Sequence, residues 1–194
     1  WMDASDPQNP LRYFGIPITL AMKRLGDYIL EPHGSLSDHQ KIVHFMTFLN
    51  PARVGYSSSP EPEATVLEEF GACGSWTFVL TALATAQGIP CRILGLYNYP
   101  QNDGHNVAEC FISGRWQVYD PTYAAYYTGE PEKEVDPVVL GFSDLEAGAG
   151  KEPGVTRVVK NPERLAAGGA LALAFVGPEI YEEANPKGPI GPDR

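Results

Sequence analysis

The segment from Cys73 to Gln87 is apolar on almost every side of a helical projection, and it contains no proline and, after Gly74, no glycine. A helix with this pattern is buried on most of its surface. Gly88 and Pro90 follow at once, and they end a helix because glycine suits the C-terminal cap and proline cannot continue the hydrogen bonding. The pattern predicts a buried helix whose first turn contains Cys73.

Downstream, the pattern changes to strands. The β-prone segments 106–112 and 116–119 are separated by Ser113 and Gly114, which is typical of a two-residue hairpin turn. Another strand is predicted at 91–99. The sequence therefore predicts an antiparallel sheet beside the helix.

The hairpin predicts a register. If Ser113 and Gly114 are the central turn residues, paired residue numbers sum to 227, and His105 lies diagonal to Asp120 on one face. An imidazole and a carboxylate in these positions can form a hydrogen bond. Cys110 has the opposite parity and is predicted to be structural, whereas Glu109 shares the His105 face and is predicted to be a supporting or solvated carboxylate.

The N-terminal third gives shorter signals. An apolar patch at 16–30 predicts one helix, and Ser37 with Gln40 forms a capping box that predicts another, ending before Asn50. His39 and His44 fall on or near this second helix and are expected to be exposed or at the edge of the core. The segment 53–62 is predicted to be a loop.

The C-terminal third is rich in glycine, proline and acidic residues, with a short strand predicted at 138–142 and a helix at 162–175. We expect four parts. They are an N-terminal extension at 1–35, a core at 36–128, a C-terminal extension packing on the core at 129–184, and a flexible tail at 185–194.

The amino-acid composition limits the classes of partner that we expect for the protein. The chain has 194 residues with a formal net charge of −10, which repels phosphate backbones and anionic lipid, so neither nucleic acid nor a membrane surface is expected as a partner. No apolar run approaches the roughly 20 residues that span a bilayer. The start, WMDASDPQNP, lacks the order of a signal peptide, and its leading Trp suggests trimming, so the compartment stays open.

Three cysteines leave at least one thiol unpaired, and their spacings of 18 and 19 residues match no zinc pattern. A metal site built from His33, His39, Cys73 and His105 is disfavoured by irregular spacing. No phosphate, haem or flavin motif is present, so no cofactor and no metal are expected.

Cys73 is the candidate nucleophile. At a helix start the dipole and the free N–H groups favour the thiolate, and the same N–H groups can point at an oxyanion. A buried structural cysteine is the alternative for this segment alone. With His105 to activate the thiol and Asp120 to orient the imidazole, the three residues form a candidate catalytic triad.

Three blocks resemble the transglutaminase-like superfamily, a papain-fold group. They are Cys73 with the helix exit at 88–90, Gly104-His105 with Glu109, and 114–116 running into Asp120-Pro121-Thr122. The resemblance implies an α+β fold, with a nucleophile helix packed on an antiparallel sheet. It also implies Cys73 as nucleophile, His105 as general base and acid, and Asp120 as the residue that orients it.

The chain departs from that family in places. Many relatives have an aromatic residue after the nucleophile where Gly74 stands, and a Trp where Val107 stands. Ser75 does not fit as nucleophile because of its distance to Gly88. The candidate substrate-binding residues are Trp76, Tyr56, Gln40 and Tyr123.

The function expected is a cysteine hydrolase or acyltransferase that forms an acyl-enzyme on Cys73. Its substrates would be peptides, proteins or small amides and esters, and the residues leave hydrolysis and acyl transfer open. The alternative is a non-catalytic binding or scaffold domain of the same fold.

Overall fold

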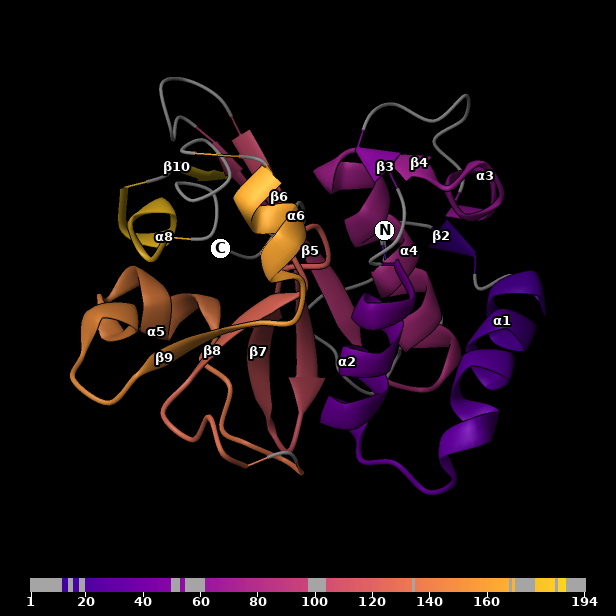
Figure 1. Cartoon of the computed structure of the whole chain (residues 1–194), viewed down its shortest axis with the longest axis horizontal. Coiled ribbons are helices and arrows are strands. Elements are labelled where there is room, and N and C mark those ends of the chain that lie inside the picture. Colours follow the sequence, from indigo (N-terminus) through magenta and orange to yellow (C-terminus); the bar gives the residue numbers. More distant parts are fainter. Residues whose placement is uncertain are drawn as a thin grey trace.

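The centre of the fold is a four-stranded antiparallel sheet with helices on both faces (Figure 1). The computed structural model describes residues 12–13, 16–17, 20–49, 53–54, 62–97, 104–133, 135–167, 169, 177–183 and 185–187. In spatial order the strands of the sheet are β10 (Asn185–Lys187), β5 (Cys91–Tyr97), β6 (Gly104–Ile112) and β7 (Arg115–Tyr119). The predicted α+β class, with the helix from Cys73 on an antiparallel sheet, is confirmed.

The other elements surround this sheet. The helices are α1 (Leu20–Leu30), α2 (Asp38–Leu49), α3 (Pro62–Glu68), α4 (Cys73–Ala86), α5 (Phe142–Glu146), α6 (Pro162–Ala167) and α8 (Glu179–Glu183), with short 3-10 turns η1 (Glu31–His33) and η2 (Ala149–Lys151). The remaining strands form two-stranded pairs: β1 (Arg12–Tyr13) with β2 (Ile16–Pro17), β3 (Arg53–Val54) with β4 (Phe70–Gly71), and β8 (Ala125–Thr128) with β9 (Thr156–Val159).

The main core lies between α4 and one face of the sheet. Leu80 and Leu83 of α4 are fully buried together with Ala108 and Cys110 of β6, and α2 adds Ile42. Full burial of one such leucine contributes roughly 1.5–3 kcal/mol. In Figure 1, α1, α2 and α4 lie on the same side of the sheet, so α1 from the predicted N-terminal extension joins the core.

The opposite face of the sheet is covered by α5 and α8 (Figure 1). Leu94, Val107 and Val118 project there, because alternate residues of a strand point to opposite faces, and they meet Leu145 and Ile180. The two helices lie within the predicted C-terminal extension. Its limits and those of the 36–128 core stay predictions.

The hairpin has the register expected from its turn. Ala108 pairs with Tyr119, as the predicted sum of 227 requires. Ser113 and Gly114 have φ angles of 52° and 81°, the left-handed geometry that a two-residue hairpin turn demands at both centres.

The helix caps were also predicted correctly. The Ser37 N–H donates to Gln40 Oε1 at 3.0 Å, and the Gln40 N–H donates to Ser37 Oγ at 3.3 Å, which is the reciprocal capping box at the start of α2. α4 runs from Cys73 to Ala86, and Gly88 beyond it has φ +80°. Both helices therefore begin where the sequence signals them.

Three predictions need correction. β10 pairs with β5 where a flexible tail was expected, because the β5 edge offers unpaired backbone groups; 188–194 lie outside the described residues. The predicted strand at 138–142 is a single bridge from Val139 to Thr128, followed by α5. Of the predicted loop 53–62, residues 53–54 pair as β3, and Pro62 begins α3, which was missed.

The helix predicted at 162–175 is α6 as far as Ala167, and most of the remainder lies outside the described residues.

Within the part of the chain that the structure describes, no helix has both the length and the apolar character needed to cross a membrane.

Candidate active site

Cys73 is the first residue of α4. The residue before it, Ala72, is extended and makes no side-chain hydrogen bond to the first-turn N–H groups. The thiol is half-buried. This is the position in which the helix dipole favours a thiolate.

His105 and Asp120 meet as the hairpin register predicts. The Nε2 of His105 lies 2.8 Å from Oδ2 of Asp120, and both side chains are 2% exposed. The other carboxylate oxygen accepts the backbone N–H of Thr122 at 2.8 Å and, more weakly, that of Tyr123 at 3.4 Å. The turn after β7 therefore holds the carboxylate, and the carboxylate holds the ring.

The electrostatics couple His105 to the thiol. Burial alone would lower the pKa of His105, but the charge and hydrogen bond of Asp120, helped by Cys73, raise it to about 10. Burial alone would raise the pKa of Cys73, yet hydrogen bonding to His105 and its charge, with smaller contributions from Asn106, lower it. The arrangement favours a thiolate beside an imidazolium.

Asn106 is the site residue that the sequence analysis missed. Its side-chain Nδ2 donates to the Cys73 sulfur at 3.6 Å, and its backbone carbonyl accepts a hydrogen bond from the Thr77 hydroxyl at 3.0 Å. The sequence held one clue to this role. Because alternate residues of a strand point to opposite faces, Asn106 points away from the His105 face of β6 and toward the face on which α4 packs.

The other candidate residues have different outcomes. Trp76 is 1% exposed and packs in the core, and its Nε1 donates to the Gly71 carbonyl at 2.8 Å, so its contact with substrate stays a prediction. Gln40 caps α2. The ring of Tyr123 lies beside the site, with its centroid 6.0 Å from that of the His105 ring, and its contact with substrate stays a prediction. Tyr56 lies outside the described residues.

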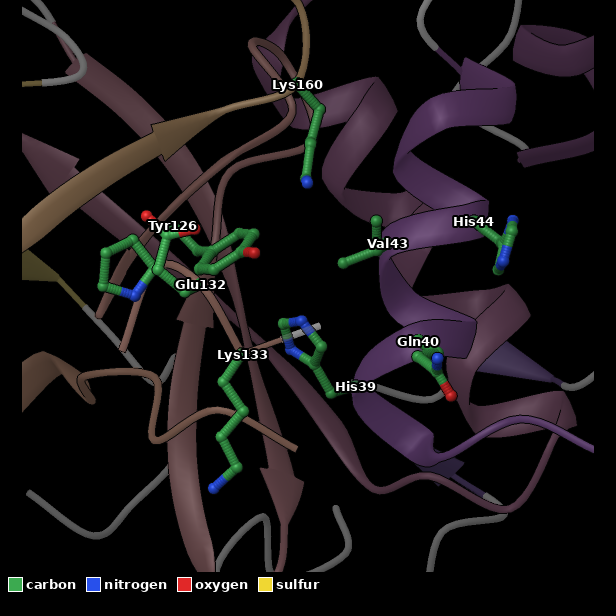
Figure 2. Close-up of a pocket in the computed structure, with 9 residues that line it drawn as sticks. His39, Gln40, Val43, His44, Tyr126, Glu132, Lys133 and Lys160 are labelled. Carbon is green, nitrogen blue, oxygen red and sulfur yellow. The ribbon is translucent and has the colours of Figure 1, made fainter. Parts of the chain in front are cut away.

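A pocket of about 230 Å³ lies between α2 and the segment around Lys133 (Figure 2). His39, Gln40, Tyr126 and Lys160 are among the residues that line it, and none of the three triad candidates does. Gln40 therefore faces a separate hollow.

His39 is buried, at 2% exposure, where an exposed or core-edge position was expected. The Gln117 amide donates to the Ile112 carbonyl, so its oxygen accepts the single Tyr119 hydroxyl proton at 3.1 Å. Nδ1 of His39, 2.9 Å from that hydroxyl, must then carry a proton and donate. Burial lowers the pKa of His39 to about 4, which agrees with a neutral ring.

The remaining cysteines and Glu109 are structural. Cys91 and Cys110 are buried with their sulfurs 2.8 Å apart, which agrees with the parity argument for Cys110. Glu109 is 2% exposed, pairs with Arg92 at 2.6 Å and accepts the Phe142 N–H at 2.8 Å, so it is a buried supporting carboxylate and not a solvated one.

A metal centre finds no support in the described segments, where no three His, Cys, Asp or Glu side chains are grouped closely enough to hold an ion. Two members of the set considered from sequence are engaged elsewhere: His33 stacks on His44 with centroids 3.8 Å apart, and His39 binds Tyr119.

Comparison with known proteins bears on this geometry. The chain is similar to a candidate cysteine protease from Cytophaga hutchinsonii, at 18% identity and a TM-score of 0.52 over 81% of this chain and 52% of that one. It is also similar to the periplasmic domain of TgpA from Pseudomonas aeruginosa, at 19% identity and a TM-score of 0.49 over 68% and 51% of the two chains. The chain thus spans about half the length of these structures. No curated protein matches it significantly.

The family model described as the transglutaminase-like superfamily matches residues 33–121. That range begins before α2 and ends just after Asp120, so it contains α4, the hairpin and all three triad candidates. The likeness to the Cytophaga structure supports the same fold. Residues 33–121, somewhat less than half of the chain, are therefore similar to the transglutaminase-like superfamily.

Proposed function

We propose that the protein is a thiol-dependent enzyme that processes amides or esters through an acyl-enzyme on Cys73. The observation that carries the proposal is the continuous coupling of a helix-start thiol to His105 and of His105 to Asp120. The match to the transglutaminase-like family model supports it, since the matched range covers all three residues. The protease description of the Cytophaga structure favours peptide or protein amides among the substrates.

The reaction divides into two halves. The Cys73 thiolate attacks the substrate carbonyl, the C=O electron pair moves onto oxygen, and N–H groups at the start of α4 stabilise the oxyanion. Collapse expels the amine or alcohol, which takes its proton from the His105 imidazolium. His105, now neutral, then removes a proton from water or an acceptor amine, whose oxygen or nitrogen attacks the thioester carbonyl. The C–S bond breaks, the acyl group leaves on its new partner, and the Cys73 thiolate and the His105 imidazolium are restored.

Asp120 contributes without touching the substrate. Its carboxylate accepts a hydrogen bond from Nε2–H of His105. The other ring nitrogen is then available for proton transfer with the sulfur and the leaving group. Two backbone N–H groups hold the carboxylate, so the ring orientation is set before substrate binds. Such preorganisation removes an ordering cost from the transition state.

The test is a substrate panel with matched variants. Purified protein is assayed on p-nitrophenyl esters, on casein-derived peptides, and on a glutamine peptide with a fluorescent amine, which separates hydrolysis from acyl transfer. Cys73→Ala should abolish every activity, and Ser75→Ala, two residues further along α4, should retain it. Activity that survives Cys73→Ala, or that is lost only in Ser75→Ala, would overturn the proposal. No activity, together with ordinary slow alkylation of Cys73, would favour the binding-domain alternative.

A further inference from the structure

We propose that Asn106 is an additional catalytic residue, whose side-chain amide binds the Cys73 thiolate and then the oxyanion formed from the substrate carbonyl. This inference deepens the proposed function and depends on it for the oxyanion step. It adds a side-chain donor to the backbone N–H groups at the start of α4.

Position is the first support. Nδ2 of Asn106 lies 3.6 Å from Cys73 Sγ. His105 and Asn106 are neighbours in β6, so their side chains point to opposite faces, yet both interact with the one thiol, at the point where the start of β6 meets the start of α4. A thiolate only accepts hydrogen bonds, so the amide must present its nitrogen.

Anchoring is the second support. The hydroxyl of Thr77, which is fully buried, lies 2.8 Å from the Cys73 carbonyl and 3.0 Å from the Asn106 carbonyl, and its one proton is shared between them. This shared bond ties the first turn of α4 to β6. The backbone that carries the amide is therefore fixed next to the start of α4, where the amide contacts the sulfur.

Space is the third support. A Cβ built on Gly74 would lie 3.5 Å from Asn106 Nδ2, which is ordinary contact and the only neighbour within 4 Å among the described atoms. A larger side chain at position 74 would therefore begin in contact with the amide and would compete with it for space. Gly74 leaves the space beside the Asn106 donor open.

The chemistry balances without a further reactant. As the S–C bond forms, the carbonyl π pair becomes a lone pair on oxygen, one bond away from the carbon attached to Cys73. A neutral amide donor can move its hydrogen bond from sulfur to that oxygen without losing a proton. Removing one such oxyanion donor costs about 10²- to 10³-fold in kcat in comparable sites.

The experiment compares Asn106→Ala and Asn106→Asp with wild type. Asp has the same size but lacks the N–H donor. Iodoacetamide labelling of Cys73 against pH reports the thiolate without substrate, and ester turnover gives kcat and KM. Both variants should raise the pH at which labelling reaches half its maximum and lower kcat at least tenfold, with KM changed less than threefold.

Gly74→Leu, with Gly74→Ala as its matched control, tests the same contact without altering Asn106. Leu should reproduce the loss and Ala should not, which keeps the inference testable if an Asn106 variant fails to fold. A lowered melting temperature with unchanged labelling profile and kcat would overturn it. If Cys73 of the wild-type protein is labelled at low pH but no acyl-enzyme forms, the proposed enzymatic function fails. The contact between Asn106 and the Cys73 thiolate is then still tested by comparing the labelling profiles of the variants.

A second inference comes from a different part of the sheet. We infer that Cys91 and Cys110 form a cross-strand disulfide when the chain folds with a disulfide oxidant. The two residues pair directly across β5 and β6, and their sulfurs are 2.8 Å apart. The Phe111 N–H donates to the Pro90 carbonyl next to them, so Cys91 and Cys110 occupy a non-hydrogen-bonded pair. In such a pair the Cα atoms are about 4.5 Å apart, within the range that disulfides span.

Two S–H bonds are lost and one S–S bond forms, while glutathione disulfide, as the oxidant, is reduced to two thiols. Because both sulfurs are buried in the folded chain, pairing should occur before the strands close. The bond would leave Cys73 as the one free thiol of the three.

Refolding in a glutathione redox buffer, followed by N-ethylmaleimide in denaturant and peptide mass mapping, tests the bond. We expect a single label, on Cys73, and a linked peptide containing Cys91 and Cys110. Labelling of all three thiols, or any linkage through Cys73, would overturn the inference. The Cys110→Ala variant should lose the linked peptide.

Discussion

Asp120→Asn removes the charge that holds His105 protonated while keeping the size of the side chain. In the native protein burial favours the neutral ring, but Asp120, 2.8 Å away, raises the pKa of His105 to about 10. Without that charge we expect the pKa to fall below its ordinary 6.5. The ring is then imidazolium at pH 7 in wild type and neutral in the variant.

The size of the effect follows from these values. A change from 6.5 to about 10 corresponds to roughly 5 kcal/mol in favour of the charged ring. An ordinary thiol with a pKa of about 8.5 is roughly 3% ionised at pH 7, so losing a formed thiolate slows alkylation by at most about 30-fold. The rise in nucleophilicity of a more basic thiolate offsets part of this. Turnover should fall further, by roughly 10⁴-fold, as the same change does in a Ser-His-Asp triad.

The assay is iodoacetamide labelling of Cys73 from pH 5 to 9, together with urea unfolding at pH 6 and pH 10. Because the folded pKa of His105 lies above its unfolded value, its contribution to stability is present below about pH 6.5 and is lost as pH rises through about 10. The stability difference between wild type and variant should therefore shrink at high pH. Superimposable labelling profiles would refute the coupling of Asp120, His105 and the thiol.

Three further changes test how the site is supported. Ser37→Ala should cost about 1 kcal/mol of unfolding free energy in urea, because it removes the α2 cap, without changing activity. Glu109→Ala should cost about 3–5 kcal/mol, since it leaves Arg92 with a half-buried unpaired charge; a loss below 1 kcal/mol would contradict this. Gly141→Ala should lower the melting temperature sharply, because its Cβ would lie 2.5 Å from a β7 carbonyl oxygen, whereas Gly129→Ala, with nothing within 4 Å, should not.

The sequence predicts the parts of the fold that local rules determine. The Ser113-Gly114 turn sets the register that brings His105 to Asp120. Gly88 marks the end of the apolar helix, and counting back along that helix places Cys73 in its first turn. Both follow from backbone geometry alone, so they need no knowledge of the rest of the chain.

What the sequence did not predict depends on contacts between distant segments. β10 exists because the β5 edge accepts it, and Trp76 is buried in the core, where the Gly71 carbonyl accepts its N–H. The hairpin register places only the His105 face of β6 beside Asp120, whereas the Cys73 thiol interacts with His105 and Asn106, whose side chains point to opposite faces.

The central claim is that Cys73 forms an acyl-enzyme, and trapping that intermediate tests it most directly. Protein is mixed with an activated ester such as p-nitrophenyl acetate, quenched in acid, and analysed by intact mass and peptide mapping. We predict one acyl group on Cys73 within the first turnover, none in Cys73→Ala, and much slower formation in Asp120→Asn. Acylation on another residue, or an acyl group on Cys73 that forms no faster than on free cysteine, would contradict the account.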